Sequence, residues 1–248
     1  MEPFDFGGGI AVVNTGHRHP LVMKRVLEQL EKFTHTCATI MPYAPFIALC
    51  AKLNAVAPLP GENPSALVPT GAQAVAHPVK FARAYTGRPA VIGFDGAFHG
   101  RTLLSLTLTS KVHPYKAGLG PFAPEVYRVP FPNAYRGPSP AEALASLRAA
   151  FTTMVAPDNV AAIVIEPIQG EGGFIVPPKG FLTGLAAFAK EHGIVFVADE
   201  VQTGFARTGD LFACEDEAII PDLIATAKGI AGGLPLSAKE PAMSLVPD

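Results

Sequence analysis

Apolar side chains in the first part of the chain recur at helical spacing. One helix face is formed by Val22, Val26, Leu30 and Phe33. A second set has the spacing i, i+3, i+4 and i+7 and comprises Phe46, Leu49, Cys50 and Leu53. Pro45 precedes this second set and suits the first position of a helix. Two helices are therefore predicted here, because such spacing places the apolar residues on one face.

Two further helices are predicted in the second half of the chain. Ser139 and Glu142 form a capping box around Pro140, so a helix should run to about Phe151. The other helix has the apolar residues Phe181, Leu182, Leu185, Phe188 and Ala189. Gly193 follows this run and should end it, because glycine readily adopts the left-handed conformation of a helix terminus.

Short apolar runs lie between the helical segments and lack polar alternation. They are Ala66–Val68, Ala90–Phe94, Ala161–Ile165, Ile194–Ala198 and Leu223–Ala227. Uninterrupted apolar runs are typical of strands covered on both faces. Alternation of such strands with helices predicts an α/β fold with a mainly parallel sheet flanked by helices. The stretch from Ser237 to Asp248 has no periodicity and is predicted to be a loose tail.

Composition and charge exclude several classes of protein. The chain has 248 residues, of which 49% are hydrophobic and 16% charged, and its net charge is −2. Without a basic cluster, nucleic acid is not expected as a partner. No apolar run reaches the length of a membrane helix, and there is no secretory signal. The three widely spaced cysteines fit a reducing cytoplasm, and no histidine group has metal-ligand spacing.

Polar residues follow several predicted strands where a parallel α/β sheet binds ligands. They are Thr70, Gly71 and Ala72, then Asp95, Phe98 and His99, then Glu166, then Asp199 and Glu200, and finally Lys228. Each has a plain structural alternative: a strand-end lysine is commonly a solvated charge, and a strand-end aspartate commonly a helix cap. Together they favour a pyridoxal-phosphate (PLP) site. A lysine can hold an aldehyde as a Schiff base, an aspartate can keep a pyridine nitrogen protonated, and a glycine turn can bind phosphate.

Five longer segments give this pattern a family resemblance. They are FDFGGGIAVVNTGHRHP at 4–20, DGAFHGRT at 95–102, EPIQGEGGF at 166–174, ADEVQTGFARTG at 198–209 and ATAKGIAGGLPL at 225–236. In this order they resemble the class III (ω-amino) aminotransferases of PLP fold type I. The segment at 111–133 looks most like that of 4-aminobutyrate aminotransferases. The resemblance implies three regions: an N-terminal helical segment at 1–55, an incomplete PLP-binding large domain at 56–238, and an atypical tail at 239–248.

The resemblance also implies roles for individual residues. Lys228 would carry the cofactor aldehyde and later move the substrate proton, and Asp199 would pair with the pyridine nitrogen. The other cofactor-binding residues would be Gly71, Ala72, Phe98, His99, Glu166, Val201 and Gln202. The substrate-binding residues would be Ile10, Arg101 and Glu171, with Arg101 on the substrate carboxylate. No metal is implied.

The implied reaction transfers the amino group of 4-aminobutyrate to PLP and then to a keto acid, 2-oxoglutarate. Three alternatives stay open from the sequence: 5-aminovalerate, acetylornithine or ornithine as the amine. A fourth, of another class, is a catalytically inactive chain that retains at most PLP binding. The family resemblance implies a homodimer whose active site is shared between subunits.

Three departures from the family pattern bear on activity. The chain is expected to be truncated at both ends, and the family's C-terminal part would supply an arginine for 2-oxoglutarate. Pro78 stands inside the helix expected after the phosphate turn, where an interior proline costs about 3 kcal/mol. The sequence KEPAMSLVPD at 239–248 matches nothing expected after GGLPL.

Overall fold

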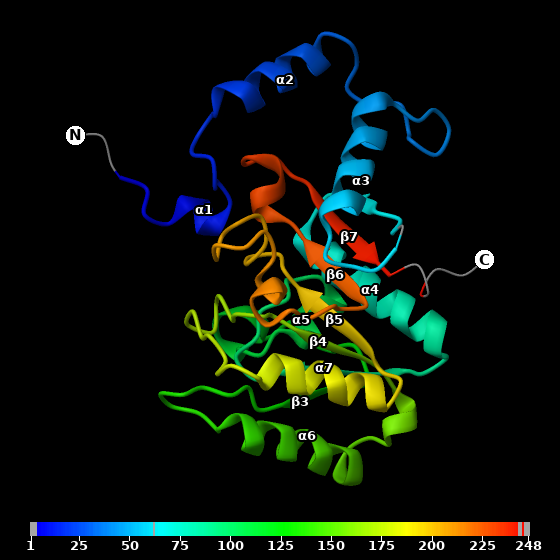
Figure 1. Cartoon of the computed structure of the whole chain (residues 1–248), viewed down its shortest axis with the longest axis vertical. Helices are drawn as coiled ribbons and strands as arrows, with labels where there is room; N and C mark the ends of the chain where they lie inside the picture. The colour runs from blue at the N-terminus through cyan, green and yellow to red at the C-terminus, as the bar shows by residue number, and fades with distance from the viewer. Residues whose placement is uncertain (1–3, 62, 243–244, 246–248) are drawn as a thin grey trace.

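A seven-stranded sheet forms the centre of the protein (Figure 1). The computed structural model describes residues 4–61, 63–242 and 245. The strands are β1 (Ala66–Val68), β2 (Ala90–Phe94), β3 (Val126–Val129), β4 (Val160–Ile165), β5 (Val195–Asp199), β6 (Leu223–Thr226) and β7 (Ser237–Pro241). Their order across the sheet is β1-β7-β6-β5-β4-β2-β3.

Strand direction in the sheet is parallel throughout except at β7. The pairs β6–β5, β5–β4, β4–β2 and β2–β3 are parallel, whereas β7 runs antiparallel to both β6 and β1. All residues of β2, β4, β5 and β6 are buried. This confirms the predicted mainly parallel sheet, and five of its strands coincide with the predicted apolar runs. Four of the five are fully buried, and burial on both faces requires apolar side chains.

Helices cover both faces of this sheet. On one face, α4 (Gly71–Thr86) lies across β4 to β7, with α5 (Leu103–Leu108) beside it. On the other face, α6 (Pro140–Thr153) and α7 (Phe181–Glu191) pack against the sheet (Figure 1). Each face has its own cluster of buried apolar side chains. The sheet is therefore the middle of three layers.

The predicted helices form with small shifts at their ends. The N-terminal helices are α1 (Gly8–Ala11), α2 (Pro20–Leu30) and α3 (Ala44–Val56). In Figure 1, α2 stands away from the sheet at one end of the molecule. Short helical turns occupy Val112–Lys116, Pro157–Asn159, Ala213–Glu217 and Lys228–Ala231. The expected capping box of α6 is present, with Ser139 and Glu142 bonded reciprocally.

Pro78 does not interrupt α4. The helix continues from Gly71 to Thr86, and Pro78 is buried within it. Thr70 caps its beginning by accepting a hydrogen bond from the Gln73 N–H, and Gly87 ends it in the left-handed conformation. The proline therefore leaves one helical carbonyl without its usual N–H donor but preserves the course of the helix.

The prediction of a loose tail from Ser237 is wrong for the first residues of that stretch. Ser237–Pro241 form β7, a fully buried strand inserted between β1 and β6. Its backbone supplies the pairing on both sides, although the sequence SAKEP has little strand character. Of the remainder, residues 243–244 and 246–248 lie outside the described residues.

Among the described residues, no helix combines the length and the apolar character that spanning a membrane requires.

Candidate active site

The carboxyl ends of the parallel strands open onto one cavity of about 630 Å³. Its wall includes eleven of the twelve catalytic, cofactor-binding and substrate-binding residues predicted from the sequence. They are Gly71, Ala72, Phe98, His99, Arg101, Glu166, Glu171, Asp199, Val201, Gln202 and Lys228. Of the strand-end positions named from the sequence, Asp95 and Glu200 do not line the cavity, and the others meet at this one site. Among all the residues that the structure describes, no cluster of three or more His, Cys, Asp and Glu side chains is placed to hold a metal ion.

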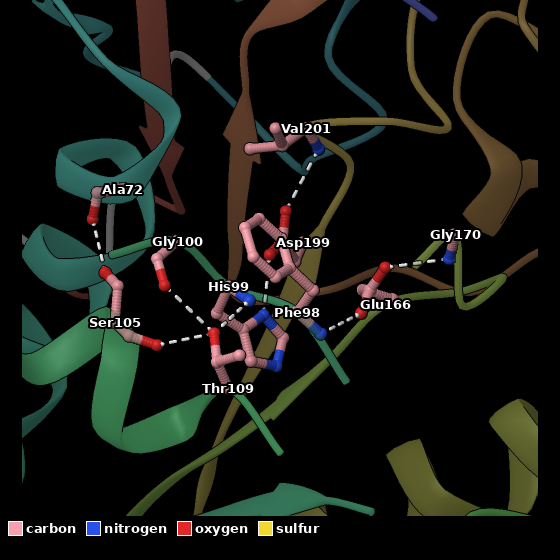
Figure 2. A network of polar contacts seen from close by, with 10 residues as sticks. All are labelled: Ala72, Phe98, His99, Gly100, Ser105, Thr109, Glu166, Gly170, Asp199 and Val201. Carbon is pink, nitrogen blue, oxygen red and sulfur yellow. Dashed lines mark hydrogen bonds and ion pairs between the residues drawn. The ribbon is translucent and has the colours of Figure 1, made fainter. Parts of the chain in front are cut away.

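A buried histidine–aspartate pair lies at the base of the cavity (Figure 2). His99 Nδ1 lies 2.6 Å from Asp199 Oδ2, and both side chains are buried. The second oxygen, Asp199 Oδ1, accepts a hydrogen bond from the Val201 N–H at 3.0 Å. Burial by itself lowers the pKa of His99, but the hydrogen bond and charge of Asp199, together with Glu166, raise that pKa above its ordinary value. The pair thus favours an imidazolium beside a carboxylate.

Glu166 is the second buried acid of the site. Its two oxygens accept backbone hydrogen bonds from Phe98 at 2.8 Å and Gly170 at 3.0 Å (Figure 2). Burial and the nearby Asp199 charge raise the pKa of Glu166 to about 7, although His99 and the two backbone donors oppose the shift. Glu166 therefore joins the turn after β2 to the loop after β4 and can change its protonation near neutral pH.

Lys228 projects from the turn that follows β6. Its backbone has a φ of 49°, in the left-handed region that few residues other than glycine occupy. Burial lowers the pKa of the Lys228 amine, while the charges of Asp199, Glu166 and Glu171 oppose the shift. A lysine with a lowered pKa has more of the neutral amine that attacks an aldehyde.

The turn between β1 and α4 is shaped to hold an anion. A Cβ atom at Gly71 would lie 3.0 Å from Val201 Cγ1 and 3.3 Å from Ala227 Cβ, so a larger side chain would crowd this wall. The backbone N–H groups here are the unpaired donors at the beginning of the 16-residue helix α4. Such helix ends bind phosphate groups.

An aromatic ring, Phe98, and an amide side chain, Gln202, line the cavity. The Phe98 ring packs against Tyr115, with ring centroids 4.8 Å apart, and Val201 contributes to the same cavity. Gln202 lies against Gly170 so closely that a Cβ at Gly170 would overlap its Oε1. Phe98, Val201 and Gln202 therefore all line the same cavity.

The predicted substrate-binding residues are not all brought together. Arg101 and Glu171 line the cavity, and Tyr115 Oη donates a hydrogen bond to Glu171 Oε2 at 3.0 Å. Ile10 is not among the residues that line the cavity; its side chain is 66% exposed and its backbone has a φ of 63°. Val12 stands on the cavity wall instead.

Sequence reasoning did not single out three residues that complete the site. Tyr115 orients Glu171, while Ser105 on α5 and Thr109 at its C-terminal cap connect the phosphate turn to His99. Ser105 and Thr109 are four residues apart within SLTLTS, a spacing that would place both hydroxyls on one helix face. That spacing is the only signal in the sequence, and it is common in helices without such a function.

The arrangement fits the three functional groups of PLP. Lys228 can hold the aldehyde, the Asp199–His99 pair can face a ring nitrogen, and the Gly71–Ala72 turn can bind the phosphate. Two observations support the fit. His99 Nε2 is buried without a hydrogen-bond partner among the described residues, and a Cβ at Gly71 would crowd Val201 and Ala227 on the cavity wall. A three-layer α/β fold with this site defines a PLP-type transferase domain.

Comparison with known proteins identifies the family. The model of class III aminotransferases matches residues 2–243. The chain therefore belongs to the class III aminotransferase family, as its sequence motifs predicted, and PLP is the cofactor of this family.

Curated relatives share about half of their residues with the chain. A 4-aminobutyrate aminotransferase of Mycobacterium leprae is 51% identical over 242 residues, which cover 94% of this chain and 54% of the relative. The Escherichia coli 4-aminobutyrate aminotransferase GabT is 49% identical, with 95% and 55% covered. The 5-aminovalerate aminotransferase DavT of Pseudomonas putida is 48% identical, with 95% and 56% covered. The chain thus spans about half the length of the curated relatives it matches.

Solved structures confirm the predicted fold. An (S)-enantioselective ω-transaminase from Thermomicrobium roseum superposes with a TM-score of 0.90 at 29% identity, over 98% of this chain and 57% of that one. A taurine:2-oxoglutarate aminotransferase from Bifidobacterium kashiwanohense, solved with PLP and glutamate, gives 0.89 at 28% identity, over 97% and 56%. The large domain of PLP fold type I is therefore the fold of this chain.

Proposed function

We propose that this chain carries the PLP-binding half of an ω-amino acid aminotransferase. The proposed reaction moves the amino group of 4-aminobutyrate to 2-oxoglutarate, with succinate semialdehyde and glutamate as products. The observation that carries the proposal is the convergence of Lys228, the Asp199–His99 pair and the Gly71–Ala72 turn on one cavity. The relatives named 4-aminobutyrate aminotransferase support this choice of amine.

The residues of the chain would share the chemical work as follows. When bound, PLP supplies a ring that accepts the electron pair released at the substrate carbon. Asp199, oriented by His99, would keep a proton on the ring nitrogen. Lys228 would hold the cofactor aldehyde, and its Nζ would move the proton at the amine-bearing carbon of the substrate. Phe98 and Val201 would hold the ring, Gln202 would bond its hydroxyl group, and Arg101 would bind the substrate carboxylate.

Cofactor capture on Lys228 is the first test. We expect PLP added to the purified chain to give a visible absorbance band that borohydride removes, with the reduced adduct found on Lys228 by peptide mass spectrometry. Lys239 is the matched control, because burial also lowers its pKa, to about 8, yet it does not line the cavity. Lys228→Ala should abolish the band and Lys239→Met should keep it. An adduct on Lys239, or no band, would refute the proposal.

Amine choice is the second test. The relative named 5-aminovalerate aminotransferase, at 48% identity, makes 5-aminovalerate the strongest alternative amine. Glutamate formation from 2-oxoglutarate should be measured with 4-aminobutyrate, 5-aminovalerate, acetylornithine and ornithine in parallel. Highest kcat/KM with 4-aminobutyrate supports the proposal. A visible band without glutamate formation from any amine supports the alternative of a chain that binds PLP without turnover, which is consistent with its spanning half the length of its relatives.

We further propose that residues 56–238 act as the PLP-binding domain and that the protein is a cytoplasmic homodimer. Large apolar side chains support association, because several are more than half exposed: Phe6, Ile40, Met41, Phe174 and Val176. Light scattering coupled to gel filtration should give twice the mass of one chain. A monomer at micromolar concentration would contradict the dimer without affecting the cofactor proposal.

A further inference from the structure

Two buried hydroxyl groups, one on α5 and one on the residue that caps its C-terminal end, connect the phosphate turn to the His99 turn (Figure 2). Ser105 Oγ donates to the Ala72 carbonyl oxygen at 2.6 Å, at the phosphate turn. Thr109 Oγ1 accepts from the His99 N–H at 3.0 Å, next to the Asp199 pair. Both residues are fully buried. One short helix therefore contacts the places where PLP would have its phosphate and its ring nitrogen.

The hydrogen bonds join into a continuous chain. Thr109 Oγ1 has the Ser105 carbonyl oxygen at 2.9 Å and the Gly100 carbonyl oxygen at 3.0 Å as acceptors for its single proton. With the His99 N–H as donor, this hydroxyl group both donates and accepts a hydrogen bond. The chain then runs from His99 Nδ1 to Asp199 Oδ2 at 2.6 Å. The bonds of Thr109 with His99 and Ser105 and of His99 with Asp199 are buried, so water cannot replace a lost partner there easily, whereas the Ser105–Ala72 bond is partly buried.

The far end of α5 is fixed as well. Lys116 Nζ donates to the Thr107 and Thr109 carbonyl oxygens at 3.2 and 2.9 Å, where the last turn of the helix leaves carbonyl groups without N–H donors. At the near end, Gly100 packs so closely on Ala72 that a Cβ would lie 2.5 Å from Ala72 Cβ. The helix therefore cannot shift without moving both the phosphate turn and the His99 turn.

We propose that Ser105 and Thr109 are positioning residues that fix the phosphate turn at a set distance from the Asp199–His99 pair. The inference rests on the proposed PLP site and assigns neither residue a contact with the cofactor. A ligand that spans both ends of the site depends on this distance, whereas a ligand that lacks the phosphate group depends only on the nitrogen end. This difference separates the positioning role from a general effect on stability.

The experiment compares PLP with pyridoxal, which has the same ring and aldehyde without the phosphate. Apparent affinities come from titration of the visible band, with borohydride labelling of Lys228 as a check. We expect Ser105→Ala to weaken PLP binding about tenfold and pyridoxal binding much less, as loss of one hydrogen bond implies. Thr109→Val should weaken both ligands and shift the pH midpoint of the band. Thr109→Ser should restore both properties.

Matched controls exist on α6. Ser146 Oγ donates to the Glu142 carbonyl oxygen at 2.9 Å and Thr153 Oγ1 to the Ala149 carbonyl oxygen at 3.0 Å. Both are bonds to the carbonyl four residues earlier, like that of Thr109 to Ser105, but within the described part of the chain neither residue lines the cavity or bonds outside its own helix. Ser146→Ala and Thr153→Val should leave both ligands unaffected. The proposal is overturned if Ser105→Ala and Thr109→Val match these controls, or if Ser105→Ala weakens both ligands equally.

A cofactor-free measurement makes the two proposals separable. Hydrogen exchange at the His99 amide should become about tenfold faster in Thr109→Val than in wild type, because this N–H loses its acceptor. Unchanged exchange overturns the positioning role whatever the cofactor does. If wild type gives no visible band with PLP while exchange responds as expected, the cofactor proposal fails and the positioning of His99 by Thr109 stands. If Thr109→Val does not fold, Ser105→Ala still tests the positioning role through the comparison of PLP with pyridoxal.

Discussion

His99 and Asp199 form an ion pair that is closed to solvent, with His99 Nδ1 and Asp199 Oδ2 2.6 Å apart. A buried carboxylate is costly unless it is paired, and here the imidazolium and the Val201 N–H share that task. Asp199 keeps lone pairs available toward the cavity because each of its oxygens accepts only one protein hydrogen bond. The pair is therefore both a structural contact and the base of the candidate cofactor site.

Removing His99 should destabilise the cofactor-free protein. His99→Leu leaves Asp199 buried without its cation, and we expect a loss of about 3 to 5 kcal/mol in the free energy of unfolding. His99→Gln retains a donor and should lose less. Since the pKa of His99 is raised, its stabilising effect is fully present below about pH 6.5 and disappears as pH rises through the folded-state pKa. Urea titrations across pH test this, with exposed His35→Leu as the control. Equal losses for Leu and Gln would contradict the pairing.

Gly100 is expected to be required for the contact between the two turns of the site. Its φ is 119°, and a Cβ would lie 2.5 Å from Ala72 Cβ and 3.2 Å from Ser105 Cβ. Gly209 has the same φ of 119° with nothing within 4 Å of a Cβ, so it isolates backbone strain from packing. Gly209→Ala should cost about 1 kcal/mol from strain alone. Gly100→Ala should cost about 2 kcal/mol more and weaken PLP binding, as measured by urea unfolding and absorbance titration. Equal effects of the two variants would exclude the packing role.

Five strands were predicted from the sequence, and four of them, all except β1, are buried along their whole length. In β2, β4, β5 and β6, burial on both sides selects apolar residues, and this requirement is visible in a single sequence. The strand β7 was missed for the opposite reason. Its sequence SAKEP contains two charges and a proline, and its place in the sheet comes from backbone pairing with residues about 170 and 15 positions earlier.

Some residues of the candidate site could be predicted because the direction of the parallel strands alone decides where these residues lie. Asp199, Glu166 and Lys228 follow parallel strands, so their convergence follows from the topology. The links between them were not predictable. The bond from Ser105 joins residues 33 positions apart, and that from Tyr115 to Glu171 joins residues 56 apart. Serine, threonine and tyrosine have many plain roles, so only their partners in space reveal these positions.

Tyr115 should influence the acidity of Lys228 through Glu171. Tyr115 Oη holds the Glu171 carboxylate on the cavity wall, where its charge opposes the lowering of the Lys228 pKa. Tyr115→Phe keeps the ring beside Phe98 but frees the carboxylate, so the pKa of Lys228 should fall further. Glu171→Gln should act in the same direction. The measurement is the pH dependence of pyridoxal capture by Lys228.

A matched control for Tyr115 is available on β3. Tyr127 Oη donates to Glu125 Oε2 at 3.1 Å, an equivalent tyrosine–glutamate bond that does not line the cavity. Tyr127→Phe should leave the pH profile of pyridoxal capture unchanged. If Tyr115→Phe also leaves it unchanged, or raises the pKa of Lys228, then Glu171 does not act on the lysine as its position indicates.

Strand β7 should give the protein an unusual dependence of stability on pH. Glu240 is 1% exposed, and neither of its carboxylate oxygens has a hydrogen-bond partner among the described residues. Burial raises the pKa of Glu240 to about 8. On the opposite face of the strand, Lys239 Nζ lies 3.1 Å from the centre of the Phe81 ring, and burial together with Lys80 lowers the pKa of Lys239 to about 8.

The shifted pKa values of Glu240 and Lys239 change the stability of the fold in opposite directions as pH rises. For Glu240, the unfolded chain releases its proton near pH 4.5 and the folded chain near pH 8, so stability falls as pH rises between these values. For Lys239, the folded chain releases its proton near pH 8 and the unfolded chain near pH 10.5, so stability rises again between these values. The free energy of unfolding should therefore have a minimum near pH 8.

Replacing Glu240 by an apolar residue tests this directly. Glu240→Leu should remove the fall between about pH 5 and about pH 8 and raise the free energy of unfolding at pH 8 by roughly 3 to 5 kcal/mol, because each unit of pKa shift corresponds to about 1.4 kcal/mol. Lys239→Leu should remove the recovery above pH 8 instead. Exposed Glu31→Leu controls for added apolar surface and should leave the pH profile intact. Urea unfolding at several pH values measures all four proteins. A wild-type profile that rises steadily from pH 5 to pH 8 would show that β7 does not hold Glu240 as a buried, unpaired acid.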